Sequence, residues 1–150
     1  MLHVALWEPE IPPNTGNVAR LCAAAGVPLH LIGRLGFRTD DRSLRRAGLD
    51  YWAAVELHRH ADLEAFEKAH AGRVFCLSVR AATPYTAARF RPGDTLLFGS
   101  ESRGLPPSAL KRHAERALTI PMPGGKVRSL NLATAVGIVL YEALRQLHGW

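Results

Sequence analysis

Apolar and polar positions along the chain follow two alternating patterns. Short apolar runs with the length of buried β-strands cover residues 2–7, 28–33, 53–59, 73–79, 95–99 and 116–121. Between them, helices are predicted at 14–26, 61–71, 106–114 and 130–147, where apolar residues such as those at 14–26 and 61–71 recur three and four positions apart. A short basic helix is predicted at 40–48, with Asp40 or Asp41 near its start. Strands alternating with helices predict an α/β fold whose mainly parallel sheet is covered by helices on both faces.

The segment 14–26 illustrates the helical pattern. Its apolar residues share one face, while Arg20 lies on a polar face. Asn14 or Thr15 is placed to cap the start of this helix, and Gly26 ends it. No linker or internal repeat interrupts the 150 residues, so we expect a single domain.

Composition adds predictions about the partners and the location of the protein. The net charge is +6, from 16 Arg and 3 Lys against 13 acidic residues, which favours a polyanionic partner such as RNA over a merely solvated basic surface. The start of the chain resembles neither a secretory signal nor a membrane span, so we expect a cytoplasmic protein. Cys22 and Cys76 have apolar neighbours typical of buried thiols. Only His58 and His60 are close in sequence, without zinc-ligand companions, so no metal is expected.

The loop 99–104 follows a predicted strand and precedes a predicted helix, so its backbone amides could hold a polar or anionic ligand. The chain has neither a G-x-G-x-x-G fingerprint nor a P-loop. A serine hydrolase is disfavoured, because Glu101 stands where the serine of a nucleophile elbow would be and no Asp and His partners stand out.

Three stretches are far more specific when taken together: EPEIPPNTGNVARLC at 8–22, LLFGSESRGLP at 96–106, and IPMPGGKVRSLNLATAVGIVLYEALRQ at 120–146. They resemble the three motifs of the SpoU-like branch of the SPOUT RNA methyltransferases. The likeness continues through residues 36–37 and 40–52, so it covers nearly the whole chain. Within that branch, the sequence resembles the small single-domain subfamily that 2'-O-methylates the wobble nucleotide, cytidine or a modified uridine, in leucine tRNAs. It implies the SPOUT fold, with a deep C-terminal trefoil knot, and S-adenosylmethionine (AdoMet) as methyl donor.

The resemblance also implies which positions bind AdoMet. They are Leu77, Ser78, Gly99, Glu101, Ile120, Met122, Ser129 and Leu130. Backbone N–H and C=O groups can read the edge of an adenine while apolar side chains sandwich its ring. For Leu77, Ile120 and Leu130 the alternative is ordinary core packing.

The catalytic set implied by the resemblance comprises Arg20, Asn14, Glu101, Ser129 and Asn131. Arg20 either activates the ribose 2'-hydroxyl or, since a guanidinium is a poor base, clamps the neighbouring phosphate and orients that hydroxyl. The alternatives are a solvated Arg20, a helix cap at Asn14 and a local ion pair between Glu101 and Arg103.

Partners follow from the same resemblance. Arg80, Arg103, Lys126 and Arg128 are candidates for phosphate contacts with the anticodon arm of tRNA. The last predicted helix has small residues at Ala133 and Gly137 and two apolar faces, which suggests one partner beyond its own sheet. The resemblance implies that this partner is a second copy, in a homodimer through the first and last helices. The alternative is a helix buried wholly within its own chain.

Two other functions remain open at this stage. A related enzyme could methylate ribosomal RNA or another tRNA position, although the lack of an accessory domain favours the wobble position. A non-catalytic RNA-binding or assembly factor could keep the same fold. The presence of all five predicted catalytic residues argues against that factor.

Overall fold

The computed structural model describes residues 1–38, 42, 46 and 52–150. The helix predicted at 40–48 falls almost entirely outside these residues. Within them, seven strands form one sheet in the order β3-β2-β1-β6-β4-β7-β5, and every pair is parallel. The strands are β1 (His3–Trp7), β2 (Leu29–Ile32), β3 (Leu57–His60), β4 (Val74–Leu77), β5 (Thr83–Pro84), β6 (Thr95–Phe98) and β7 (Ala117–Thr119). The predicted parallel α/β sheet is confirmed.

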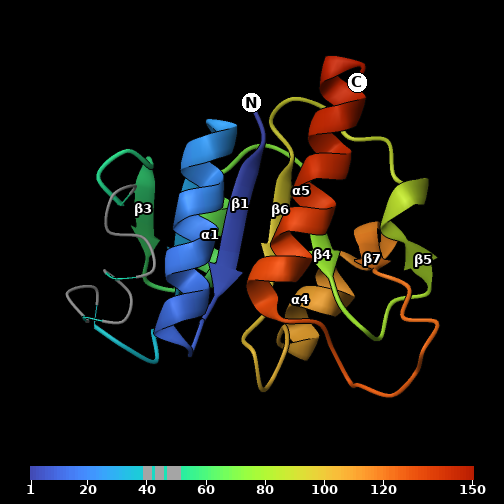
Figure 1. Cartoon of the computed structure of the whole chain (residues 1–150), viewed down its shortest axis with the longest axis horizontal. Coiled ribbons are helices and arrows are strands. Elements are labelled where there is room, and N and C mark those ends of the chain that lie inside the picture. Colours follow the sequence, from blue (N-terminus) through green and yellow to red (C-terminus); the bar gives the residue numbers. More distant parts are fainter. Residues whose placement is uncertain (39–41, 43–45, 47–51) are drawn as a thin grey trace.

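Helices cover both faces of this sheet. They are α1 (Pro12–Ala25), α3 (Leu63–Ala69), α4 (Pro107–Arg112) and α5 (Leu132–His148), with 3-10 turns at Tyr85–Ala87 and Ala114–Arg116. Alternate side chains of β1 enter two separate cores: Val4 and Leu6 pack with α1 and α5, whereas Ala5 packs with α3 and α4. Helices α1 and α5 lie side by side on one face (Figure 1). This two-faced burial explains why the strands read as nearly continuous apolar runs.

Helix α1 begins two residues earlier than predicted, and the capping prediction for Asn14 and Thr15 is wrong. Its N-cap is Ile11, and Pro12 and Pro13 occupy the first helical positions, where their missing N–H groups cost nothing. The N–H of Asn14 donates to the Ile11 carbonyl at 3.1 Å, so the first turn is satisfied without a side-chain cap. The predicted end at Gly26 is confirmed, with a left-handed φ of 68°.

Other boundaries moved for local reasons. The strand predicted at 53–59 is β3 at Leu57–His60, an edge strand with exposed side chains at His58 and Arg59, so periodicity marks it poorly. The two-residue edge strand β5 is too short for any periodic signal, and its Pro84 is tolerated only at an edge. Helix α5 is capped by the Asn131 side chain, which accepts from the N–H of Thr134.

The deep trefoil knot stays a prediction. No helix within the described ranges is both long enough and apolar enough to cross a membrane.

Candidate active site

Three loops meet at the carboxyl edge of the sheet, where parallel α/β folds bind ligands. Strand β4 lies between β6 and β7, and Leu77 at its end is in register with Phe98 and Leu118. Gly99 follows β6 directly, and Ile120 follows β7 directly. The structure therefore brings together the loops that contain the predicted AdoMet positions.

Side chains at this edge differ in what they offer a ligand. Leu77 is only 9% exposed and belongs to the core, so the packing alternative accounts for much of its surface. Ile120 and Leu130 are half-buried, and Ser129 is exposed. The Ser78 N–H already donates to the Leu118 carbonyl at 2.9 Å, which joins the ends of β4 and β7.

The loop after β6 is a closed turn. Ser100 and Gly104 exchange two backbone hydrogen bonds, of 3.2 and 2.9 Å. The backbone of Gly104 lies so close to Gly99 that a Cβ on Gly99 would stand 2.1 Å from its carbonyl carbon. This contact requires glycine at position 99.

Glu101 projects from this turn toward the start of α1. Its Oε1 accepts from the N–H of Glu10 at 2.8 Å, and its Oε2 accepts from the N–H of Ile11 at 2.9 Å and from Nδ2 of Asn14 at 3.2 Å. Oδ1 of Asn14 accepts in turn from Nδ2 of Asn131 at 3.0 Å. Three predicted catalytic residues thus form one hydrogen-bonded chain between loops more than 80 residues apart.

The local ion pair proposed between Glu101 and Arg103 is wrong. The Arg103 guanidinium instead pairs with Glu8 at 3.1 Å and lies over the Trp7 ring, 5.0 Å from its centroid. The Glu8 carboxylate also accepts from the N–H of Arg34. Arg103 therefore binds the end of β1 in its own chain, which leaves it a weaker candidate for phosphate.

Sequence reasoning assigned no role to Glu8, Glu10 or Ser102, although all three lie within the matched motifs. The Glu10 carboxylate accepts from both the N–H and the hydroxyl of Ser102. These hydrogen bonds, that of the hydroxyl first, lower the pKa of Glu10. The sequence signal for Glu8 and Glu10 is that both acidic residues of EPEIPP lie directly after a predicted strand, at the edge where ligands bind.

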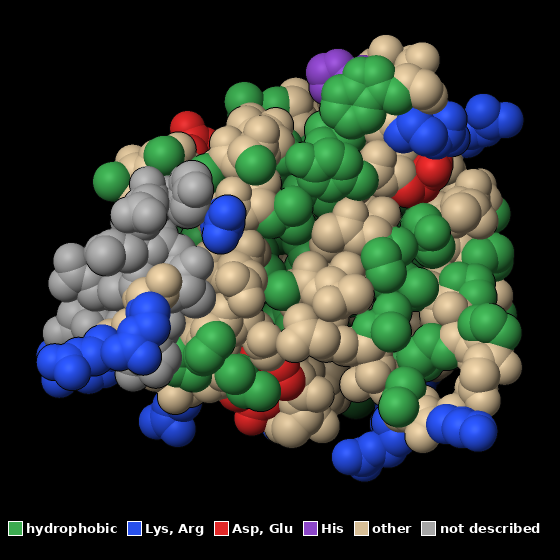
Figure 2. All heavy atoms as spheres, in the orientation of Figure 1, with side chains coloured by type: hydrophobic (Ala, Val, Ile, Leu, Met, Phe, Trp, Pro, Cys, Tyr) green, Lys and Arg blue, Asp and Glu red, His purple; other side chains and the backbone are tan. Residues whose placement is uncertain are grey.

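Arg20 lies on the exposed face of α1, six residues after Asn14 and so about 9 Å further along the helix axis. Arg80, Lys126 and Arg128 are exposed in the loops that follow β4 and β7. Figure 2 shows Lys and Arg side chains along the lower margin, the end of the molecule where β1 terminates in Figure 1. A polyanion approaching the carboxyl edge would therefore meet positive charge.

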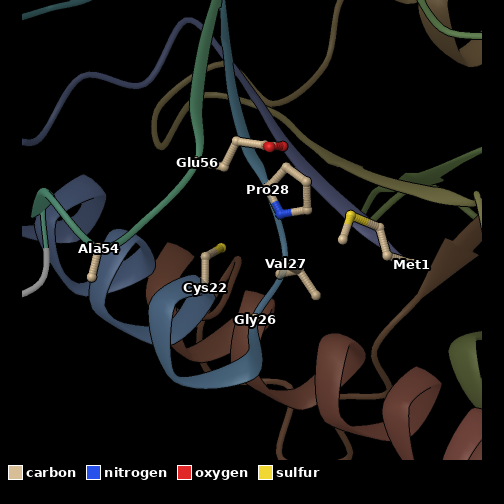
Figure 3. A pocket seen from close by; sticks show the side chains of 7 residues that line it. All are labelled: Met1, Cys22, Gly26, Val27, Pro28, Ala54 and Glu56. Carbon is tan, nitrogen blue, oxygen red and sulfur yellow. The ribbon is translucent and has the colours of Figure 1, made fainter.

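A separate hollow of about 230 Å³ lies at the opposite, amino edge of the sheet (Figure 3). It is lined by Met1, Cys22, Gly26, Val27, Pro28, Ala54 and Glu56. None of these is a predicted site residue. Burial raises the pKa of the Cys22 thiol to about 12, which disfavours the thiolate form that a nucleophile needs. In the part of the chain that the structure describes, no group of three or more His, Cys, Asp or Glu could hold a metal ion.

Comparison with known families and proteins gives a consistent set of similarities. A model described as the SpoU rRNA Methylase family matches residues 1–141. The tRNA (cytidine(34)-2'-O)-methyltransferase of Escherichia coli (strain K12) is 49% identical over 149 residues, covering 98% of this chain and 94% of the relative. The enzyme of the same name from Aeromonas hydrophila is 50% identical over 149 residues, covering 98% and 95%.

Solved structures give the same result. One described as providing structural insights into the 2-OH methylation of C/U34 on tRNA superposes with a TM-score of 0.95 at 56% identity, covering 100% of this chain and 98% of the other. The AdoMet-bound rRNA methyltransferase from Sinorhizobium meliloti superposes with a TM-score of 0.86 at 31% identity, covering 97% of this chain and 56% of the other.

Proposed function

Because the chain belongs to the SpoU rRNA Methylase family, we propose that it is an AdoMet-dependent methyltransferase that modifies the ribose 2'-hydroxyl of the wobble nucleotide in tRNA. The observation that carries this proposal is the near-complete match, at a TM-score of 0.95, to a structure concerned with 2-OH methylation of C/U34. The nucleotide would be cytidine or a modified uridine, in leucine tRNAs. A tRNA substrate also fits the cytoplasmic location predicted from the sequence.

The carboxyl edge fits AdoMet in part. Backbone groups after β4, β6 and β7 lie at this edge for the adenine, although the Ser78 N–H is already bonded to Leu118 and leaves the carbonyl of that residue. Half-buried Ile120 and Leu130 offer apolar surface to the adenine ring. Glu101 fits less well, because both carboxylate oxygens already accept from N–H groups of this chain. When bound, AdoMet supplies an electrophilic methyl group. We assign its binding to the backbone of Ser78, Gly99 and Met122 and to the two apolar side chains.

The chain's own residues would place the acceptor. A guanidinium keeps its proton at neutral pH, so we assign Arg20 to clamp the phosphate beside the ribose and orient the 2'-hydroxyl. Ser129 and Asn131 adjoin the donor loop and are assigned to the same ribose. Rate enhancement would come mainly from holding the reacting atoms in line at roughly 3 to 3.5 Å.

We further propose a homodimer through α1 and α5, with each active site bordered by the other subunit, and a knotted C-terminal part. Figure 2 shows hydrophobic side chains gathered over α5 on the face shared with α1. Tyr141 of α5 and Trp150 are exposed, at 42% and 65%, and their ring centroids lie 6.5 Å apart. Gly137 instead faces α1 of the same chain, because a Cβ on it would lie 3.8 Å from the Leu21 side chain. The exposed aromatic residues therefore support the dimer better than Gly137 does, whereas Ala133 is partly buried against the core of its own chain.

The test is to incubate the protein and labelled AdoMet with total tRNA from a strain lacking the enzyme and to map the methylated nucleotide. We expect label on the 2'-oxygen of the wobble nucleotide in leucine tRNAs. Label at another tRNA position, or only in ribosomal RNA, would identify the related enzyme instead. Binding of RNA without any transfer would identify the non-catalytic factor.

A further inference from the structure

A chain of side-chain amides joins the starts of both long helices to the loop after β6. The backbone N–H of Thr134 donates to Oδ1 of Asn131 at 3.2 Å. Nδ2 of Asn131 donates to Oδ1 of Asn14 at 3.0 Å, and Nδ2 of Asn14 donates to Oε2 of Glu101 at 3.2 Å. Every hydrogen bond in the chain therefore points the same way, from α5 toward Glu101.

The two ends fix this direction. A backbone N–H can only donate, so Asn131 must turn its oxygen toward Thr134. At the other end, each oxygen of Glu101 accepts from a backbone N–H of residues 10 and 11, so the carboxylate can only accept from Asn14. An amide has one oxygen and one nitrogen end, and reversing either asparagine would oppose two acceptors or two donors.

The direction decides what the two amides can offer a ligand. Both amide oxygens are bonded within the chain, while each amide nitrogen keeps a second N–H after these bonds. An N–H can donate to the oxygens of a ribose or phosphate, whereas an outward amide oxygen would repel phosphate oxygens, which can only accept.

We propose that Glu101 is a positioning residue that sets the direction of this chain, so that Asn14 and Asn131 present N–H donors to oxygen atoms of the RNA substrate. This inference rests on the proposed function, and it gives Glu101 a role different from direct contact with the donor. The carboxylate acts through Asn14, its hydrogen-bond partner, and through Asn14 on Asn131.

Reversing the direction without breaking the chain tests this role. Glu101→Gln places an NH2 group where Asn14 donates, and Asn131→Asp places an oxygen opposite Oδ1 of Asn14. Each single change opposes like groups. Together they restore the chain in the opposite direction: the new amide at 101 donates to Oδ1 of Asn14, Nδ2 of Asn14 donates to the new carboxylate at 131, and that carboxylate still accepts from Thr134. The N–H of Ile11, which donates to Oε2 of Glu101, faces the new NH2 group both in Glu101→Gln and in the double variant, so this cost is the same in both.

We expect the double variant to lose less stability to urea than the sum of the losses in the two single variants. The turnover number for RNA methylation should fall roughly 10- to 100-fold in Asn131→Asp and in the double variant, because position 131 has lost its donor, and in Glu101→Gln, because the direction of Asn14 is no longer set. A purely structural role would restore turnover together with stability. The matched control is Glu115→Gln, an exposed glutamate next to β7, which should behave as the wild type.

Two outcomes would overturn the proposal: additive loss of stability in the double variant, or turnover in the double variant equal to the wild type. Failure of the proposed function would look different. In that case the unaltered protein would methylate no tRNA, while the unfolding experiment, which needs neither ligand, would still report whether the amide chain has the stated direction.

Discussion

The carboxylate of Glu10 accepts hydrogen bonds from both the backbone N–H and the hydroxyl of Ser102, at 2.8 and 2.7 Å. In return, Glu101 accepts from the N–H groups of Glu10 and Ile11. The loop after β1 and the loop after β6 are therefore tied in both directions, although more than 90 residues separate Glu10 from Ser102. This pairing holds the start of α1 against the predicted donor pocket.

Removing the Ser102 hydroxyl should loosen that pocket. We expect Ser102→Ala to weaken AdoMet binding roughly three- to tenfold, since a hydrogen bond to a carboxylate is lost at an exposed site. Ser102→Thr keeps the hydroxyl and should bind as the wild type. Ser108→Ala, an exposed serine in α4, is the matched control. Titration calorimetry measures the affinities, and unchanged binding by Ser102→Ala would refute the prediction.

Gly99 should not tolerate a side chain. In Gly99→Ala the new Cβ would stand 2.1 Å from the backbone of Gly104, so the Ser100–Gly104 turn must open. We expect a loss of about 1 to 3 kcal/mol in the free energy of unfolding and loss of AdoMet binding. Gly124→Ala is the control, because nothing lies within 4 Å of its Cβ position. Equal denaturation midpoints for the two variants would show that the turn can adapt.

Much of the fold could be predicted from the sequence because its signals are local. The apolar face of α1, its end at Gly26 and the buried β1 follow from residues a few positions apart. The predicted strand ends also indicated that the loops after β4, β6 and β7 meet at one edge, since the carboxyl ends of parallel strands lie on the same side of a sheet.

The features that the sequence did not predict depend on contacts between distant residues, which hydrophobic periodicity does not encode. Glu101 binds backbone N–H groups, and any residue type at positions 10 and 11 except proline would supply them. The N-cap was misplaced for the same reason, because two prolines and a backbone carbonyl replaced the expected cap. The pairing of Arg103 with Glu8 joins residues 95 apart, and only the fold shows it.

Arg20 can be tested separately from the donor pocket. Its side chain is on the exposed face of α1, so we expect Arg20→Ala to keep AdoMet affinity and lose roughly 100-fold in methyl transfer. Arg20→Lys keeps the charge without the planar fork and should recover only part of the loss. Single-turnover assays with tRNA measure the effect. Wild-type transfer by Arg20→Ala would remove this residue from the mechanism.

Thr15 marks a place where α1 can be stabilised. Its hydroxyl is buried and has no hydrogen-bond partner among the described residues. Thr15→Val keeps the branched shape and removes the unsatisfied group, so we expect the free energy of unfolding to rise by about 1 kcal/mol. Thr86→Val, at an exposed position, should stay within about 0.5 kcal/mol of the wild type. A loss of stability in Thr15→Val would mean that the hydroxyl is satisfied after all.

The fold gathers histidines that are scattered along the sequence. Nδ1 of His3 lies 2.9 Å from Nε2 of His30, and Nδ1 of His30 lies 2.9 Å from Nε2 of His60. His70 packs edge-on against His3 and bonds to Thr95. Burial, and after it neighbouring imidazoles, lower the pKa of His30 to about 3. Burial is also the first cause that lowers the pKa of His3, His60 and His70, although Asp94 partly opposes it at His70 and Glu56 does so at His3.

This cluster should make the protein sensitive to acid. The unfolded chain takes up protons near pH 6.5, whereas the folded cluster stays neutral to lower pH. Stability should therefore be complete above that pH and fall as the pH drops, by up to about 1.4 kcal/mol per pH unit for His30 and by less for its more exposed neighbours. Urea unfolding between about pH 7 and pH 5 measures the slope. His30→Gln should reduce it, His148→Gln outside the cluster should keep it, and equal slopes in both variants would contradict a neutral His30.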